Sequence, residues 1–315
     1  MTTDTIQSTR ITFGEKATAY FRLGKLRVYH HFYAWLLAVL LLAHESVSRP
    51  GMAVALGLML VGMIAMKVAT CAADDVVGFR DGSDAKNYAT GGHLPKSNKP
   101  LLSGMVTERE AIAYGVITGL IALGAGLALL IPLDGDVPIG FLIAYFVVVA
   151  VAVQYSWLFQ FSYRPAGLEF VIFLVNTAEV LGPVWLIARH WSTDSVLIGL
   201  LVGVCMLLVV SYANFGDRVG DLESGRRTLA AVVPPAIYRG LIAVLSVLSL
   251  LLLVAPFVIG SLNPLLVVCV LPAIVLRAMQ IRAGLIQDQV QRAVVLGFRS
   301  IDAMGLGLAL ALVVS

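Results

Sequence analysis

Residues 194–228 read DSVLIGLLVGVCMLLVVSYANFGDRVGDLESGRRT. The apolar part, 194–214, is about as long as a helix that crosses the hydrocarbon core of a bilayer, which needs about 20 residues. It runs directly into the acidic and basic residues between Asp217 and Arg227. The stretch therefore predicts a membrane helix that ends in a charged cluster at the membrane surface.

The composition of the whole chain agrees with a membrane protein. Of its 315 residues, 59% are hydrophobic and 13% are charged, and the mean hydropathy is +0.91. Soluble domains usually contain about 25% charged residues and are less than half apolar. The composition therefore argues against a soluble enzyme, a disordered chain and a protein that binds nucleic acid.

Eight further apolar segments accompany the first. They are long and lack a period-two alternation, so helices fit and a β-barrel does not. We expect an all-α, polytopic membrane protein with nine transmembrane helices in one bundle, formed by residues 32–315 after a leader at 1–31. The expected segments are 32–48, 51–72, 110–132, 138–160, 167–189, 194–214, 234–258, 262–279 and 297–315.

The basic residues predict the orientation of the chain. With the N-terminus inside, nineteen of the 22 Lys and Arg residues fall on the inner side; Arg49 and Arg189 fall outside, and Lys67 lies within an apolar segment. Cytoplasmic loops carry such an excess of positive charge. We expect a multi-pass protein of the plasma membrane, with the N-terminus and the two large gaps, 73–109 and 215–233, in the cytoplasm.

Both large gaps begin with acidic residues at the end of an apolar segment. If the helices continue, Asp217 and Asp221 lie one turn apart on one face, and Asp74 and Asp81 lie two turns apart. Hard cations relieve the repulsion among such carboxylates, and Mg²⁺ typically binds one or two carboxylates together with substrate phosphates. The predicted metal ligands are Asp74, Asp75, Asp81, Asp84, Asp217 and Asp221.

These acids predict a site for Mg²⁺, with Mn²⁺ as the alternative cation. Nearby basic residues suit phosphate oxygens; they are Lys67, Arg80, Lys99 and Arg226. The alternative is that the acids are simply solvated loop residues. Two clusters on the same side, each continuing a helix, favour the site. A Ca²⁺ site is a weaker alternative because the EF-hand spacing is absent.

The second gap resembles the second motif of the UbiA superfamily of intramembrane prenyltransferases, D-x-x-x-D followed by G-(K/R)-x-T. The segment 99–111 resembles the stretch after the family's first motif. Residues 82–84 and 163–169 are most similar to the branch that prenylates dihydroxynaphthoate. The resemblance covers nearly the whole chain. The residues that match the second motif are Asp217, Asp221, Gly225, Arg226 and Thr228.

The first motif departs from the family's N-D-x-x-D opening. Here it reads Asp74-Asp75-Val-Val-Gly78, so Asp74 replaces the usual Asn and Gly78 replaces the usual second Asp. On a continued helix, Asp81 lies on the same side as Asp74 and Gly78. We therefore expect Asp81 to supply the missing carboxylate, and Asp75, which points about 100° away, to matter less.

The resemblance implies transfer of a prenyl group from an isoprenoid diphosphate to a small aromatic acceptor of the quinone-precursor type. The diphosphate would lie between the two acidic clusters, with Asp74, Asp81, Asp217 and Asp221 as catalytic residues. Tyr155 and Arg164 match family positions near the diphosphate. The intramembrane residues Glu169, Asn176 and Glu179 would position the acceptor or take its proton; the alternative is that they only form interhelical hydrogen bonds.

Two other functions stay open. One is a terpene cyclase of the same superfamily, which ionises the diphosphate without an acceptor. The other is a non-catalytic transporter or lipid-binding membrane protein, for which polar residues near the bilayer midplane are typical. The acids lie at one surface instead, which argues against the second.

The charge asymmetry makes a prediction about topology. A membrane-impermeant thiol reagent should label single cysteines placed at Ser83 and Ser224 from the cytoplasmic side, and one at Asp136 from the opposite side. Labelling of positions 83 and 136 from the same side would contradict the nine-span arrangement.

Overall fold

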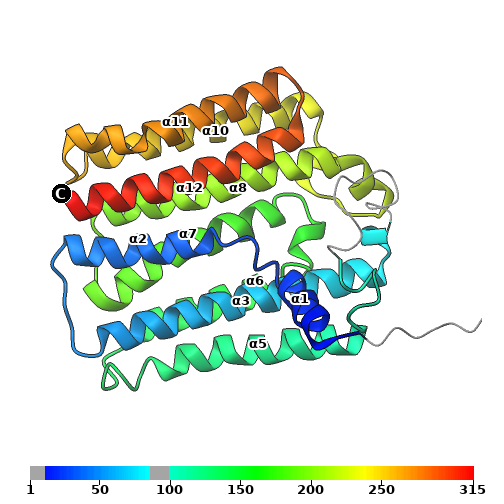
Figure 1. Ribbon diagram of the computed structural model, residues 1–315, viewed down its shortest axis with the longest axis horizontal. Coiled ribbons are helices and arrows are strands. Elements are labelled where there is room, and N and C mark those ends of the chain that lie inside the picture. The colour runs from blue at the N-terminus through cyan, green and yellow to red at the C-terminus, as the bar shows by residue number, and fades with distance from the viewer. Residues whose placement is uncertain (1–10, 86–98) are drawn as a thin grey trace, which may run out of the picture.

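The computed structural model describes residues 11–85 and 99–315, which form helices and no strand. The helices lie along one long axis as a single bundle (Figure 1). The prediction of an all-helical fold is confirmed. In chain order the principal helices are α1 (Phe13–Leu23), α2 (His31–His44), α3 (Met52–Arg80), α5 (Glu108–Ala128), α6 (Ile139–Val153), η2 (Phe161–Tyr163), α7 (Gly167–Ala188), α8 (Thr193–Glu223), α9 (Leu229–Val232), α10 (Pro235–Val258), η3 (Pro264–Val270), α11 (Leu271–Ile281), η4 (Arg282–Ile286) and α12 (Val290–Val314).

Each of the nine predicted apolar segments contains a helix in the described ranges. Seven helical stretches there are long and apolar enough to cross a membrane, with η3, α11 and η4 counted as one. The other two, α2 and α6, have 14 and 15 residues. At 1.5 Å per residue they reach roughly 21 to 23 Å, which is less than the hydrocarbon core of about 30 Å.

Three helix ends matter for the polar end of the bundle. Helices α3 and α8 continue beyond their apolar parts to Arg80 and Glu223, so Asp74, Asp75, Asp217 and Asp221 all lie on helices. The predicted segment 138–160 is wrong at its C-terminal end, because α6 ends at Val153 and the chain turns before η2. This turn places polar side chains beside α3.

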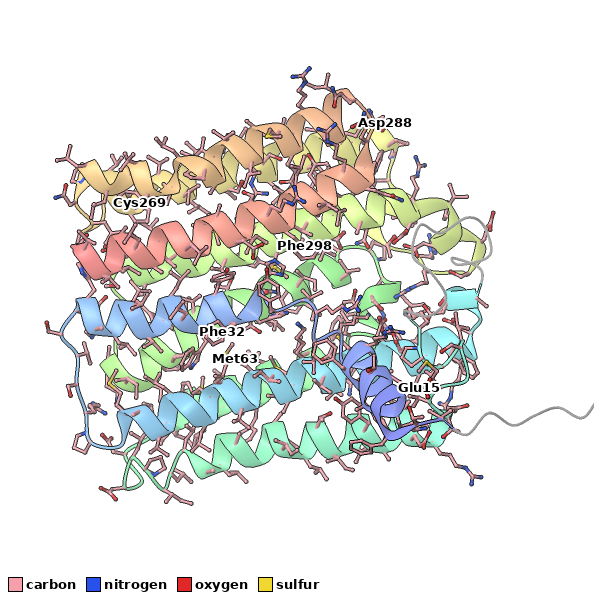
Figure 2. All side chains as sticks on the ribbon, viewed as in Figure 1. Glu15, Phe32, Met63, Cys269, Asp288 and Phe298 are labelled. Carbon is pink, nitrogen blue, oxygen red and sulfur yellow. The ribbon has the colours of Figure 1, made fainter. Side chains whose placement is uncertain are left out.

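Polar side chains gather at one end of the bundle. Side chains along the middle of the helices are mostly carbon, whereas nitrogen and oxygen atoms are frequent toward the end where Glu15 and Asp288 are labelled (Figure 2). Helix α1 lies across α3 at this end (Figure 1), and its Lys16 binds Glu110 of α5 at 2.7 Å. Charges thus stay where water can solvate them, as the cost of burying charge requires.

The segment between α1 and α2 enters the bundle. The ammonium of Lys67 on α3 donates to the carbonyl of Val28, and the ring of His30 stacks on Phe298 of α12 with centroids 4.6 Å apart. Helix α2 consequently begins at His31 inside the protein, which explains why it is short. Residues 11–31 of the predicted leader contain α1 and this segment; residues 1–10 lie outside the described residues.

The start of α3 lies close to the turn that follows α5, and this contact predicts an effect on stability. Gly51 has a φ of +73°, and a Cβ atom there would lie 1.7 Å from the carbonyl oxygen of Pro132, whereas nothing lies within 4 Å of one on Gly57. Gly51→Ala should lower the free energy of unfolding by about 1–3 kcal/mol. Gly57→Ala, the matched control, should leave it unchanged or raise it. Thermal unfolding in detergent measures both, and equal effects would contradict the contact.

Candidate active site

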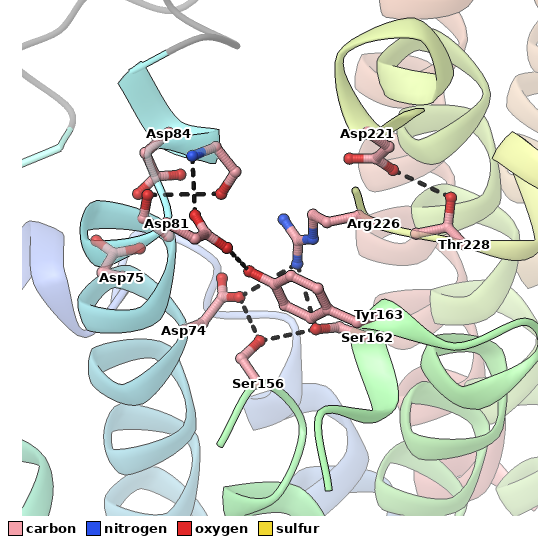
Figure 3. A network of polar contacts seen from close by, with 12 residues as sticks. Asp74, Asp75, Asp81, Asp84, Ser156, Ser162, Tyr163, Asp221, Arg226 and Thr228 are labelled. Carbon is pink, nitrogen blue, oxygen red and sulfur yellow. Dashed lines mark hydrogen bonds and ion pairs between the residues drawn. The ribbon is translucent and has the colours of Figure 1, made fainter. Parts of the chain in front are cut away.

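The candidate site lies where the C-terminal ends of α3 and α8 meet the turn after α6 (Figure 3). Asp74 is the centre of its contacts. Its Oδ1 accepts a hydrogen bond from the Ser156 hydroxyl at 2.7 Å and lies 3.6 Å from Arg226 Nη2. Its Oδ2 accepts from Lys25 Nζ at 2.9 Å. One carboxylate therefore connects the segment before α2, the turn after α6 and the loop after α8.

Asp75 anchors the other side of the first motif. It is 1% exposed, and Lys99 Nζ lies 2.7 Å from its Oδ1 and 2.9 Å from Asp84 Oδ2. Burial lowers the pKa of Lys99, but the carboxylates of Asp75, Asp84 and Asp74 together raise it above its usual value. Lys99 therefore stays charged and ties residue 99 to α3. Asp75 takes part in the network rather than pointing away from it.

The space beside Gly78 is filled by a carboxylate. A Cβ atom on Gly78 would lie 2.9 Å from Asp84 Cγ and 3.0 Å from both of its carboxylate oxygens. Asp81 instead caps the C-terminus of α3, where its Oδ1 accepts from the Ser83 amide at 2.8 Å and its Oδ2 from the Tyr163 hydroxyl. The structure thus places Asp84 next to Gly78, where we expected Asp81.

The second motif folds back on the end of α8. Asp221 is 4% exposed, and its Oδ2 accepts a hydrogen bond from the Thr228 hydroxyl at 3.1 Å. The Asp221 carbonyl accepts from the Arg226 amide at 2.8 Å. This tight return aims the Arg226 guanidinium at Asp74, where it also donates to Ser162 Oγ at 3.2 Å. Arg226 therefore lies between the carboxylates of the two motifs (Figure 3).

Two tyrosines border the same place. The guanidinium of Arg226 lies 4.6 Å from the ring centre of Tyr163. Burial, and after it the hydrogen bond to Asp81, raises the pKa of Tyr163. Burial and the carboxylate of Asp74 raise the pKa of Tyr155. Both phenols are therefore protonated at neutral pH and can act as hydrogen-bond donors.

Several residues predicted for the site lie apart from this network. Arg80 pairs with Glu108 of α5 at 2.6 Å near the surface. Arg164 is exposed in the turn after η2. Lys67 binds the backbone carbonyl before α2. Asp217 is exposed and lines an open cavity between α8 and the start of α12.

The three polar residues predicted to hold an acceptor face different neighbours. Glu169 accepts a hydrogen bond from the Tyr238 hydroxyl of α10 at 3.3 Å. The Asn176 side chain donates to the backbone carbonyl one turn earlier, at 2.7 Å. Glu179 pairs with His31 of α2 at 2.8 Å. Glu169, Asn176 and Glu179 therefore have different partners, which belong to α10, α7 and α2 respectively.

Sequence reasoning missed Lys25, Ser156 and Ser162. In the sequence, Lys25 is only one of the positive charges of the leader, Ser156 lies in the predicted apolar segment 138–160, and Ser162 lies in the short gap after it. No spacing pattern points to them, because each reaches the site through a turn. Lys25 itself, and Gln160 between the two serines, adopt left-handed backbone conformations in these turns.

Two cavities adjoin the network. One of about 590 Å³ is lined by Arg80, Asp81, Ser156 and Tyr163, and is open. The other, of about 430 Å³, lies between α3, α5 and α6, and apolar side chains form most of its wall. Both are lined by Trp157. A molecule with a charged head and an apolar tail could therefore place each part in a matching environment.

The donor atoms of the network fit a hard divalent cation. In the described ranges, no three His, Cys, Asp or Glu residues are grouped as a complete metal site. The network nevertheless holds an excess of carboxylates over cations, which leaves two negative charges, and oxygen ligands are those that Mg²⁺ prefers. The carboxylates are Asp74, Asp75, Asp81, Asp84 and Asp221, and the cations are Lys25, Lys99 and Arg226.

Comparison with known proteins gives one family and several similar structures. Residues 32–301 match the UbiA prenyltransferase family, whereas no curated protein matches the chain. A UbiA homologue from Archaeoglobus fulgidus, bound to GPP and Mg²⁺, is 14% identical with a TM-score of 0.64; the match covers 94% of this chain and 100% of that chain.

Two further structures have the same fold. A digeranylgeranylglyceryl phosphate synthase is 14% identical with a TM-score of 0.62, and the match covers 96% of this chain and 100% of that one. The apo UbiA homologue from Aeropyrum pernix K1 is 16% identical with a TM-score of 0.62, over 93% and 98% of the two chains.

The contact between Gly78 and Asp84 makes a prediction about coupling. Gly78→Ala should lower the free energy of unfolding by about 1–3 kcal/mol, because the new methyl group meets the Asp84 carboxylate. In an Asp84→Ala background the same substitution should cost much less. A double-mutant cycle of thermal stabilities measures the difference, and an equal cost in both backgrounds would contradict the contact.

Proposed function

The chain belongs to the UbiA prenyltransferase family, and on that premise we propose that it transfers a prenyl group from an isoprenoid diphosphate to a small aromatic acceptor, with Mg²⁺ as the cofactor. One observation carries the proposal: Asp74 of the first motif and Asp221 of the second lie on either side of Arg226 at one end of the bundle. Support comes from the similar Archaeoglobus homologue, which binds GPP and Mg²⁺.

The diphosphate of the donor enters the polar cavity beside Ser156 and Tyr163. Arg226 and Lys99, which belong to the network beside this cavity, bind its oxygens, and the protonated phenol of Tyr155 donates a hydrogen bond to it. Tyr163, whose hydroxyl donates to Asp81, borders the site. The prenyl tail occupies the adjoining apolar cavity that shares Trp157. Each part of the donor is then surrounded by side chains of its own polarity.

The six predicted acids are the metal ligands of this proposal, and Asp84 takes the role that we expected of Asp81. Bound Mg²⁺ supplies positive charge to the diphosphate oxygens as a Lewis acid. Arg226 adds a fixed positive charge where negative charge grows as the bond between C1 and the diphosphate oxygen breaks. The acids are Asp74, Asp75, Asp81, Asp84 and Asp221 of the network, together with Asp217, which lies one turn before Asp221 on α8 and outside the network.

Prenyl transfer follows from loss of the diphosphate. The electron pair of the broken C–O bond leaves with the diphosphate, and the allylic group at C1 becomes cationic. A ring carbon of the acceptor attacks C1, and the ring then loses a proton. The apolar walls between α3, α5 and α6 keep water away from the cation.

The arrangement in the cell is part of the proposal. Residues 32–315 form the prenyltransferase domain in the plasma membrane, and all nine apolar helices cross the bilayer, α2 and α6 with the help of the segments that flank them. The polar end faces the cytoplasm, as the distribution of Lys and Arg favours. The acceptor belongs to the dihydroxynaphthoate type that residues 82–84 and 163–169 resemble.

Purified protein incubated with Mg²⁺ and prenyl diphosphates of several lengths, with and without aromatic acceptors, tests the function. We expect a prenylated acceptor to form. EDTA should abolish its formation, and added Mg²⁺ should restore it. A hydrocarbon product that forms without any acceptor would instead indicate a terpene cyclase. Absence of diphosphate release under every condition would contradict both enzymes.

Two neighbouring arginines give a matched pair for the diphosphate site. Arg226→Ala should lower kcat/KM for the donor at least about 10²-fold, because it removes charge next to the leaving group. Arg227→Ala should stay within about threefold, since Arg227 is exposed and contacts Tyr163 through its backbone amide. Steady-state kinetics at saturating Mg²⁺ measures both, and equal losses would argue against the placement of Arg226.

A further inference from the structure

A buried acid–base pair lies deeper in the bundle than the carboxylate network. Glu179 of α7 is 3% exposed, and both of its carboxylate oxygens lie 2.8 Å from Nδ1 of His31, the first residue of α2. Lys67 of α3 is close enough to Glu179 to interact with it electrostatically. The segment that enters the bundle before α2 therefore delivers a histidine to a carboxylate in the interior.

The depth of the pair follows from the geometry of α3. Lys67 precedes Asp74 by seven residues, which is two turns along one face, so it lies about 10 Å deeper in the membrane. The pair beside Lys67 is therefore below the network that surrounds Asp74. Leu174 and Val175, which precede Glu179 on α7, lie on the side of the pair that faces the network.

Glu179 lines an apolar cavity. This cavity, of about 250 Å³, lies between α3, α6 and α7, and its walls include Met59, Met63, Phe141 and Val175. Among the residues that the structure describes, Glu179 is the one charged residue that lines it. An apolar cavity of about 150 Å³ holds a benzene molecule, so this one has room for a small aromatic compound.

A carboxylate in an apolar wall favours a ligand that can donate a hydrogen bond to it. Burying a carboxylate is costly unless donors satisfy its oxygens. A hydrocarbon tail cannot do this, whereas a hydroxylated aromatic ring offers apolar faces to the methionines and a hydroxyl group to Glu179. The cavity and its one acid therefore match the chemistry of a hydroxylated aromatic ligand.

We propose that the cavity binds the aromatic acceptor, that Glu179 accepts a hydrogen bond and then the proton from an acceptor hydroxyl, and that His31 positions Glu179. This inference rests on the proposed prenyl transfer. As the hydroxyl proton moves to Glu179, the ring becomes more nucleophilic, and a ring carbon forms its bond to C1 while the C–O bond of the donor breaks. The ring proton at that carbon then leaves for the diphosphate or solvent, and Glu179 returns its proton to the oxygen.

Glu179→Gln tests the role of the carboxylate with little change in shape. We expect kcat for transfer to fall by about 10²- to 10⁴-fold, which is the usual contribution of a general base. Mg²⁺-dependent binding of radiolabelled geranyl diphosphate should be unchanged. Asp194→Asn is the control for loss of a buried acid, because Asp194 lies at the opposite end of the bundle, bound to Ser261; it should keep its turnover.

His31→Gln gives a second and independent readout. Glutamine can still donate to Glu179, so the fold is preserved, but it holds the carboxylate less firmly. We expect kcat to fall about tenfold and KM for the acceptor to rise, while KM for the donor stays unchanged. A purely structural pair would lower thermal stability without this split between the two substrates.

The possible results separate the inference from the function on which it rests. Transfer by the wild type together with equal transfer by Glu179→Gln would overturn the inference alone. A change in donor chain-length preference with unchanged acceptor kinetics would assign the cavity to the prenyl tail and also overturn it. A wild-type protein that releases diphosphate but prenylates no aromatic compound would overturn the proposed function.

Discussion

The ion pair between Asp74 and Arg226 is the interaction on which the polar end of the molecule depends. Asp74 belongs to α3, and Arg226 belongs to the loop that returns from α8, so their contact fixes two halves of the bundle relative to each other. Ser156 and Lys25 complete the shell of Asp74 from two other segments. Both side chains are partly buried, so loss of either partner would leave the other charge less well compensated. The geometry of both acidic motifs therefore rests on one carboxylate.

The network is balanced so that it can accept a cation and an anion together. Its cations do not neutralise all of its acids, and several of the acids are almost completely buried. Such a site is costly when empty, because like charges stay close together in a medium of low polarity. In the proposed reaction, a divalent cation and a diphosphate bound together would lower this cost, so that the same groups would contribute to binding and to catalysis.

The sequence predicted the helical bundle well because a membrane helix satisfies its own backbone hydrogen bonds. Hydrophobicity alone then marks where each helix lies. The end of α6 at Val153 was not predictable, because several of the residues that follow it are apolar enough to continue the helix. The chain turns there instead, and this turn brings Ser156 to Asp74 of α3. The position of Asp84 beside Gly78 was not predictable for a similar reason: α3 ends at Arg80, and Gly82, with a φ of +75°, turns the chain back. The acids of a motif can be recognised in a sequence, whereas the residues that distant turns place beside them cannot.

Gly78 and Asp84 behave as one packing unit, and this has a consequence for how the chain can change over generations. A side chain at position 78 would press against the Asp84 carboxylate, which would have to shift to admit it. A lineage that gains an acid at position 78 is therefore favoured to lose or shorten the residue at position 84, and an acid at 84 packs best against glycine at 78. Related sequences should consequently divide into two groups, each with one of the two arrangements, and few should carry both acids.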